Sequence, residues 1–365
     1  MRLVVKIGSS SLTDDDGAIA SESIHKLSVE LSELRAAGHE VVVVSSGAVA
    51  SGLPVMGFDA ASRPTDSTTL QAVSAVGQAR LMQTWNEQLA GQGLVAGQVL
   101  LAPHDFMVRA QYLFARSTLE RLIELGVIPV VNENDAVADD EIRFGDNDRI
   151  AALVAHLISA DLLVLLTDMP GLMDADPRSS GQATLIEEII QIDHELELLA
   201  GGAGTARGSG GMASKLSAAK IAAWSGVRTV IAAATRPRVL LDAVDQVPGV
   251  GTTVLARDNQ LSARKLWIAF ALPSSGRIVI DAGAVRALSA GGVSLLAAGV
   301  TEVHGNFEAL NAVEIVDEAG NVIAKGLTGL SAHSVQELAG RRSSDMSERS
   351  GEIVHCDDLV ILPKP

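Results

Sequence analysis

The sequence predicts an α/β protein with an open, mainly parallel sheet sandwiched by helices, followed by a small β-barrel. Up to about residue 255, short β-branched runs alternate with segments of helical period, a pattern typical of βαβ units. Aromatic residues make up only 3% of the chain, so the core must consist mostly of Val, Leu, Ile and Ala, as in buried parallel strands. Beyond residue 276 the segments shorten and turn residues separate them, which favours a β-rich unit.

The order of elements in the first part follows from the apolar pattern. Strands are expected at Leu3–Ile7, Glu40–Val44, Val95–Leu101, Val127–Val131, Asp161–Leu166 and Val227–Ala232, and helices at Ser21–Ala37, Thr68–Ala90 and Arg109–Leu125. Gly38 and Gly126 each stand where a helix must end before the next strand, as a left-handed C-terminal cap requires.

The domain organisation follows from a lapse in this pattern. We expect a first domain over residues 1–258, a linker over 259–275 and a second domain over 276–365. The linker begins in the polar, basic stretch ARDNQLSARKLW and ends in the turn PSSG. The short segments RIVIDAG, NAVEIVDEAG and NVIAKGLTGL then predict strands, with a helix at His333–Leu338.

Charge and cysteine content narrow the function classes. The formal net charge is −16, which repels nucleic acid and anionic membrane surfaces, so a site for an anionic nucleotide must be locally basic. The single cysteine, Cys356, cannot form an intrachain disulfide, and no Cys/His cluster has the spacing of a structural zinc site. The start MRLVVKIGSS lacks a signal-peptide pattern, and no apolar run reaches the roughly 20 residues of a membrane span. We therefore expect a cytoplasmic protein without membrane contact.

Polar residues and glycines follow several predicted strands, where ligands bind in open α/β sheets. Lys6 interrupts an apolar strand, and a buried ammonium group needs an anionic partner; the alternative is an edge lysine that reaches solvent. Gly8 and Gly47 would let the backbone approach phosphate or carboxylate oxygens, although each could also be an ordinary turn glycine.

A glycine-rich segment, GSGGMASK, opens a predicted helix and ends in Lys215. Helix N-termini already favour anions, so a cation there is expected only if an anion such as phosphate lies beside it. The alternative is a flexible glycine linker with an incidental lysine. The chain lacks G-x-x-x-x-G-K-[ST], and no G-x-G-x-x-G follows its first strand, which argues against P-loop and dinucleotide-binding proteins.

Two acidic residues, Asp146 and Asp148, come just before another predicted helix, Arg149–Ile158. Asp146 could simply be the N-cap of that helix. Asp148 could also orient two lysines that would otherwise repel one another. Phosphoryl transfer requires such fixed charges, because its catalysis is mostly positioning and electrostatic stabilisation.

Several motifs together resemble those of the glutamate 5-kinases within the amino acid kinase family. They are VVKIGSS, VVVVSSGAVASG, PVVNENDAV, FGDND, LLTDMPGL and GSGGMASK, and the resemblance covers essentially the whole chain. It implies the amino acid kinase fold and transfer of the ATP γ-phosphoryl group to the side-chain carboxylate of L-glutamate, the first step of proline synthesis. A carboxylate is already nucleophilic, so this reaction needs no general base.

The resemblance also implies residue roles. Lys6 and Lys215 would neutralise the transferring phosphoryl group and Asp148 would organise them. Glutamate would be bound by Ser46, Gly47, Asn132, Asp135 and Asn147. ATP, with Mg²⁺ as cofactor, would be held by Lys6, Gly8, Thr167, Asp168, Ser209, Gly210, Gly211, Met212, Ala213, Ser214 and Lys215. No metal site made of protein ligands alone is expected.

The C-terminal segments GRIVIDAGAVRALSAGGVSLLAAGV and VHGNFEALNAVEIVDEAGNVIAKG are similar to a PUA domain, a small barrel found in RNA-modifying proteins. From Ser275 to Pro365 there are seven Lys/Arg and twelve Asp/Glu, a local net charge of −5 that argues against RNA binding. The alternatives are an RNA-binding or RNA-modifying protein, or a kinase acting on aspartate or acetylglutamate. The resemblance further implies a dimer or tetramer, coupling to glutamyl phosphate reductase, and inhibition by proline. The acidic run Asp139–Glu141 could lie beside the amino-acid pocket and contribute to that inhibition; the alternative is a solvated acidic surface.

Overall fold

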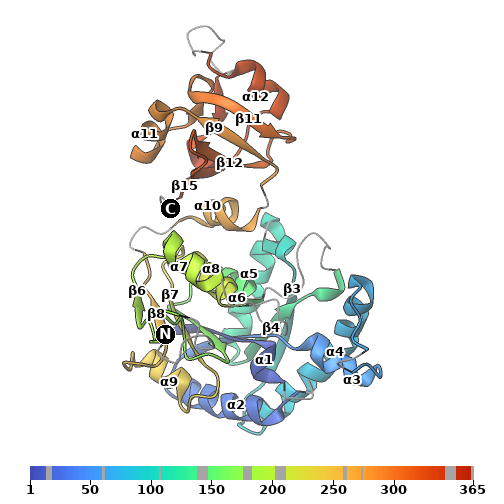
Figure 1. Cartoon of the computed structure of the whole chain (residues 1–365). Coiled ribbons are helices and arrows are strands. Elements are labelled where there is room, and N and C mark those ends of the chain that lie inside the picture. The colour runs from blue at the N-terminus through green and yellow to red at the C-terminus, as the bar shows by residue number, and fades with distance from the viewer. Residues whose placement is uncertain are drawn as a thin grey trace. The chain divides into compact units, whose positions relative to one another are not determined.

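A computed structural model describes residues 1–13, 19–59, 62–106, 108–137, 147–175, 183–201, 211–257, 261–272, 274–341 and 351–362. The chain divides into two compact units, Met1–Gln260 and Leu261–Pro365, whose elements are labelled in Figure 1.

The first unit is built on a sheet that runs β3-β4-β2-β1-β5-β7-β8-β6. Its strands are β1 (Arg2–Ile7), β2 (Glu40–Ser45), β3 (Ala96–Leu101), β4 (Ile128–Glu133), β5 (Leu162–Thr167), β6 (Glu188–Ile189), β7 (Arg228–Ala233) and β8 (Thr252–Val254). Neighbouring strands pair in parallel, except β7 with β8. The predicted mainly parallel sheet is confirmed, and each predicted strand lies within two residues of an observed one.

Helices cover both faces of this sheet, so the unit has three layers (Figure 1). One face packs on α2 (Ser21–Ala36), α4 (Ser67–Ala90) and α9 (Val239–Val244), and the other on α5 (Arg109–Glu124), α6 (Asn147–Leu157) and α8 (Met212–Trp224). Leu3, Val5 and Ile7 of β1 belong to the core shared with α2, α4 and α9. Because side chains alternate along a strand, Val4 and Lys6 point to the opposite face, toward α6.

Two helices on the rim of this unit touch through glycines. These helices are α3 (Ala48–Val55) and α4, and a Cβ on Gly77 of α4 would lie 1.8 Å from the carbonyl oxygen of Ala48. A Cβ on Gly52 of α3 would lie 2.0 Å from the carbonyl oxygen of Val73. No side chain fits between the backbones, so α4 is held at a fixed place beside the end of β2.

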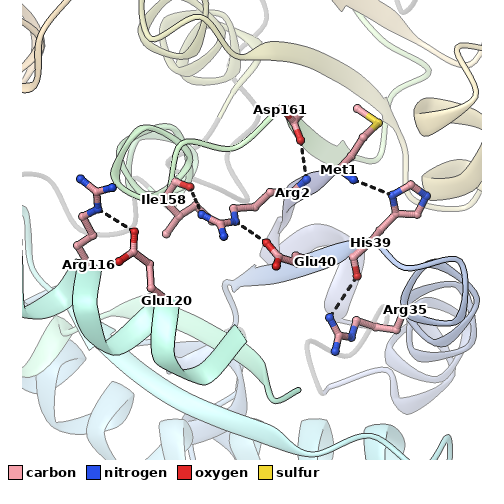
Figure 2. Close-up of polar contacts among 9 residues, drawn as sticks. All are labelled: Met1, Arg2, Arg35, His39, Glu40, Arg116, Glu120, Ile158 and Asp161. Atoms are coloured by element: carbon pink, nitrogen blue, oxygen red, sulfur yellow. Dashed lines mark hydrogen bonds and ion pairs between the residues drawn. The ribbon is translucent and has the colours of Figure 1, made fainter. Parts of the chain in front are cut away.

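The amino ends of the central strands are tied together by one arginine (Figure 2). Arg2 Nε donates to Glu40 Oε2 at 2.7 Å, and Arg2 Nη1 donates to the carbonyl oxygen of Ile158 at 2.6 Å. The backbone N–H of Arg2 donates to Asp161 Oδ2 at 2.7 Å. These contacts join β1 to β2 and to the segment before β5, at the end of the sheet away from the predicted ligand-binding edge.

The second unit contains a five-stranded sheet ordered β11-β9-β12-β13-β15 and a two-stranded one, β10-β14. Its elements are β9 (Gly276–Ile280), α11 (Ala282–Ala290), β10 (Leu295–Leu296), β11 (Val300–Gly305), β12 (Ala312–Asp317), β13 (Val322–Leu327), α12 (Ala332–Leu338), β14 (Glu352–Val354) and β15 (Leu359–Ile361). Ile278, Phe307, Ile315 and Val335 lie in its core. A small β-rich unit with a helix near residue 333 is what the sequence predicts.

The segment expected to be a linker, residues 259–275, contains helical structure that packs against strands of the second unit. Residues 263–271 form α10 (Ala263–Leu266) and a π-helical turn (Trp267–Ala271). Ile268 is fully buried against residues of β12, β13 and β15, and Lys325 Nζ donates to the carbonyl oxygen of Ala269 at 3.4 Å. The apolar side chains that follow the basic stretch explain this packing, because they bury surface on the second unit.

Candidate active site

Two lysines and one aspartate form a buried charge cluster at the carboxyl end of β1. Lys6 Nζ lies 2.6 Å from Asp148 Oδ1, and Lys215 Nζ lies 3.2 Å from Asp148 Oδ2. Lys6 and Lys215 are each 4% exposed and Asp148 is 1% exposed. Three distant segments thus bring two ammonium groups to opposite oxygens of one carboxylate.

Local structure explains why these side chains meet. Lys6 is on the face of β1 that packs against α6, and Asp148 lies in the first turn of α6. Lys215 lies in the first turn of α8, where the structure shows no acidic side chain, and Ser214 Oγ donates to Asp148 Oδ2 at 3.1 Å. Although burial raises the pKa of Asp148, the charges of Lys6 and Lys215 outweigh it and hold this pKa below its ordinary value. The carboxylate is therefore ionised at neutral pH.

A second polar cluster lies at the carboxyl end of β4, where three of the predicted glutamate-binding residues meet. Asn132, Asp135 and Asn147 are 2%, 8% and 4% exposed. The backbone N–H of Glu133 donates to Asn132 Oδ1 at 2.8 Å and to Asn147 Oδ1 at 3.2 Å. Asn147 directly precedes Asp148, so this cluster adjoins the lysine cluster through the start of α6.

Asp135 is the acidic member of the second cluster. It lies in the 3₁₀ turn Asp135–Val137 and accepts a hydrogen bond from Ser74 Oγ of α4 at 2.5 Å. Burial raises the pKa of Asp135, and the hydrogen bond from Ser74 opposes this shift. An ammonium group bound beside Asp135 would favour its ionised form and so offset the effect of burial.

The turn after β2 contributes Ser46 and Gly47. Trp85 Nε1 donates to Ser45 Oγ at 2.9 Å, and Ser45 Oγ donates to the carbonyl oxygen of Ser46 at 3.0 Å. This chain of two hydrogen bonds holds the turn in place. Gly47 has φ +106°, in the left-handed region, and begins α3. A Cβ at Gly47 would also lie 3.3 Å from Ile19 Cδ1. The backbone conformation therefore favours glycine here, and the nearby Ile19 side chain leaves little room for a larger residue.

The predicted nucleotide-binding residues lie near the ends of β1 and β5 and at the start of α8. Thr167 Oγ1 donates to Asp168 Oδ1 at 3.0 Å, and Asp168 is exposed while Thr167 is buried. A Cβ on Gly8 would lie 3.7 Å from Lys6 Nζ, so the Gly8 backbone borders the lysine cluster. Gly211, Met212, Ala213 and Ser214 form the start of α8. Ser209, Gly210, Asp146 and the acidic run 139–141 lie outside the described residues.

Comparison with known proteins decides the family. The model of the amino acid kinase family matches residues 1–233, and that of the PUA domain matches residues 276–349. The chain belongs to the amino acid kinase family. It is 45% identical to the glutamate 5-kinase of Herminiimonas arsenicoxydans, covering 99% of this chain and 98% of that protein. It is 46% identical to the glutamate 5-kinase of Ralstonia nicotianae, covering 99% and 97%. The resemblance stated from the motifs is confirmed.

Solved structures of this family show the same fold at low sequence identity. A product complex of T. acidophilum isopentenyl phosphate kinase superposes with a TM-score of 0.50 at 19% identity, covering 70% of this chain and all of that one. Carbamate kinase from Giardia lamblia bound to AMP-PNP gives 0.50 at 16% identity, covering 70% and 98%. An amino acid kinase fold followed by a PUA domain is therefore the architecture of this family member.

Sequence reasoning missed two residues of α4 that contact the polar cluster. Ser74 binds Asp135, and Gln78 Oε1 accepts a hydrogen bond from Asn132 Nδ2 at 2.7 Å. Both are buried, and they lie four residues apart on one side of the helix. The one sequence signal nearby is Gly77, a glycine inside a long helix, which indicates close packing but does not mark Ser74 or Gln78 as site residues.

None of the helices among the described residues is long and apolar enough to span a bilayer. Within the same part of the chain, His355, Cys356 and Asp357 have ligand-type atoms within 4.8 Å of one another. His355 Nδ1 already accepts a hydrogen bond from the backbone N–H of Asp357 at 3.1 Å, so this group is a turn of consecutive residues.

Proposed function

We propose that this protein catalyses the ATP-dependent phosphorylation of the side-chain carboxylate of L-glutamate, giving L-glutamyl 5-phosphate. The observation that carries the proposal is the pair of buried ammonium groups on opposite oxygens of Asp148, adjoining a cluster suited to an amino acid. The near full-length similarity to glutamate 5-kinases supports the choice of substrate.

The chemistry requires little more than positioning and charge. An oxygen of the substrate carboxylate attacks the γ-phosphorus of ATP, the bond to the bridging oxygen breaks, and ADP leaves with that electron pair. No proton has to be removed from a carboxylate, so no general base is needed. Lys6 and Lys215 stabilise the negative charge on the transferring group, and Asp148 holds their ammonium groups in place.

Mg²⁺ fits this site as part of the nucleotide. Both oxygens of Asp148 already contact lysine, so Asp148 does not offer a free oxygen to a cation. Asp168, whose carboxylate is exposed at the end of β5, is the protein group that would hold Mg²⁺, together with phosphate oxygens and water. When bound, Mg²⁺ neutralises charge on the phosphate groups.

The amino acid is held by the second cluster and by the turn after β2. Asp135 accepts the α-ammonium group, and the Ser46 hydroxyl, the Gly47 N–H and the amides of Asn132 and Asn147 donate to carboxylate oxygens. Thr167, Asp168, Gly8 and the segment of the chain from Ser209 to Lys215 hold ATP. These roles are proposals that rest on the family's motifs and on the placement of the described residues.

An ATP-dependent assay with hydroxylamine trapping tests the function. L-glutamate, L-aspartate and N-acetyl-L-glutamate are offered separately, and acyl phosphate is detected as hydroxamate. Hydroxamate formed from glutamate alone is the expected result. Activity with aspartate or acetylglutamate but not glutamate would refute the substrate and keep the reaction class, while no activity with any of them would refute both.

Other expectations of the sequence remain predictions. They are the domain limits 1–258 and 276–365, a dimer or tetramer, coupling to glutamyl phosphate reductase, inhibition by proline and a cytoplasmic location. The PUA match raises RNA binding as a second function, but the local net charge of −5 opposes it. A salt-dependent RNA shift assay with the full chain distinguishes the two: we expect weak or no binding.

A further inference from the structure

One backbone N–H determines how the amide groups of the second cluster are oriented. The N–H of Glu133 can only donate, and it contacts Asn132 at 2.8 Å and Asn147 at 3.2 Å. Both side chains must therefore present their carbonyl oxygens to it, because an amide NH₂ in either place would set donor against donor. The Nδ2 groups of Asn132 and Asn147 then point away from Glu133.

This orientation passes from Asn132 to Gln78. Asn132 Nδ2 is a donor, so the Gln78 atom 2.7 Å from it must be the acceptor Oε1. The other atom of the Gln78 amide, Nε2, is a donor that the bond to Asn132 does not use. Among the described residues it has no hydrogen-bond partner, and the same holds for Nδ2 of Asn147.

Burial makes these amide donors informative. Gln78 is 9% exposed and Asn147 is 4% exposed. An amide donor on a side chain with so little exposure, and with no partner among the described residues, is placed to meet an acceptor that enters the site. Amide NH₂ groups in such a place suit an anionic oxygen, which is the chemistry of a carboxylate.

The helix α4 places this donor next to the proposed ammonium site. Ser74, which binds Asp135, precedes Gln78 by one helical turn, and residues at this spacing have Cβ atoms about 5–6 Å apart. In an α-amino acid the ammonium and the α-carboxylate share one carbon atom, so their binding groups must be neighbours. Asp135 and Gln78 meet this requirement through a single rigid helix.

We propose that Gln78 binds the α-carboxylate of the substrate: its Nε2 donates to a carboxylate oxygen while its Oε1 stays bonded to Asn132. This inference rests on the proposed function. Gln78 thereby selects an amino acid whose α-carboxylate is free, and it leaves the side-chain carboxylate to approach the lysine cluster.

The decisive variant is Gln78→Glu. A glutamate here still offers an oxygen to Asn132 Nδ2, but it replaces the free donor with a negative charge. We expect the KM for glutamate to rise about 10- to 100-fold, the range for a lost hydrogen bond to a charged group. The KM for ATP should change less than about threefold. If Gln78 only oriented Asn132, Gln78→Glu would leave both values unchanged, which would overturn the proposal.

A matched substrate sharpens the test. L-isoglutamine carries an amide in place of the α-carboxylate, and this amide can donate to the carboxylate introduced by Gln78→Glu. The variant should therefore shift the ratio of kcat/KM values from L-glutamate toward L-isoglutamine, by about 100-fold or more relative to the wild type, since both partners exchange roles. Equal losses on the two substrates would also refute the proposal.

Controls separate the possible failures. Gln83 is an exposed residue of the same helix that bonds Glu87, so Gln83→Glu should leave all constants at wild-type values. Gln78→Leu, which loses both bonds, shows by its thermal unfolding how much of any effect is structural. A wild-type protein without glutamate-dependent hydroxamate would refute the proposed function, whereas an active wild type with an unaffected Gln78→Glu would refute only the role of Gln78.

Discussion

Replacing Asp148 by asparagine should destabilise the first unit strongly, because it leaves two buried lysines without their counter-charge. Asparagine keeps the size of the side chain, so the change is one of charge and creates almost no cavity. Removing one partner of a buried ion pair costs about 3–5 kcal/mol, and here a single carboxylate serves both ammonium groups at 2.6 and 3.2 Å. With about 2–4 °C per kcal/mol for a unit of this size, we expect the Tm to fall by roughly 10 °C.

The pH dependence has a definite sign. Since the pKa of Asp148 is lowered in the folded state, its contribution to stability is complete above the ordinary carboxyl pKa and is lost only as pH falls through the lowered value. In the wild type, the contribution of Asp148 to stability should therefore be constant between pH 6 and 8. Inorganic phosphate should raise the Tm of the variant more than that of the wild type, because an anion replaces the missing charge.

Thermal and urea unfolding followed by tryptophan fluorescence measure this effect, since Trp85 and Trp224 both lie in the first unit. Glu124→Gln is the control: its ion pair with Arg121 is more than 60% exposed on both sides, so at most about 0.5 kcal/mol is expected. A loss for Asp148→Asn as small as that of the control would show that the lysines do not depend on this carboxylate, and the reasoning would fail.

Three other substitutions test the site in different ways. Lys215→Ala should lower kcat in the hydroxamate assay about 10²- to 10³-fold with the fold retained, because one stabiliser of the transferring charge is lost; unchanged turnover would contradict its role. Ser74→Ala removes the hydrogen bond that opposes the raised pKa of Asp135, so the KM for glutamate should begin to rise at a higher pH as the medium is acidified; identical KM profiles would exclude this. Gly77→Ala adds a methyl group 1.8 Å from a backbone oxygen of α3, so about 3 kcal/mol of stability should be lost in urea unfolding, whereas Gly91→Ala, whose nearest contact is 3.4 Å, should be nearly neutral.

The sheet was predictable because its signal is local. The central strands β2 and β5 are short apolar runs bounded by glycines or polar residues, and burial on both faces makes such runs continuous in sequence. The antiparallel pairing of β7 with β8 and the packing of Ile268 were not, because both depend on contacts between segments whose own patterns are weak. In the segment around Ile268, a polar stretch is followed by an apolar one, and this pattern does not indicate which surface the apolar residues will cover.

The residues of the site also differ in whether the sequence alone could predict them. Lys6 interrupts the apolar pattern of its strand and Lys215 stands at a helix start, so both suggested an anion. Each alone had another interpretation, an edge lysine or a linker lysine, and only their predicted positions at a strand end and at a helix start made them a pair. Ser74 and Gln78 violate nothing: polar residues inside a long helix are ordinary, and only the contact of α4 with α3 at Gly52 and Gly77 brings them to the carboxyl end of β4. Their role depends on a distance set by tertiary packing, and a single sequence does not contain that distance.

The charge cluster also explains how an acidic protein can keep a nucleotide site stable before the nucleotide arrives. Two buried ammonium groups alone would repel each other, whereas one carboxylate between them leaves a single net positive charge in place. The start of α8 adds about half a charge more in the same direction. The carboxylate thus stabilises the empty site without cancelling its attraction for phosphate, and an excess of local positive charge persists in a chain of net charge −16. A second carboxylate here would make the empty site neutral and remove that attraction, so one acid for two lysines is the ratio that a phosphoryl-transfer site of this kind requires.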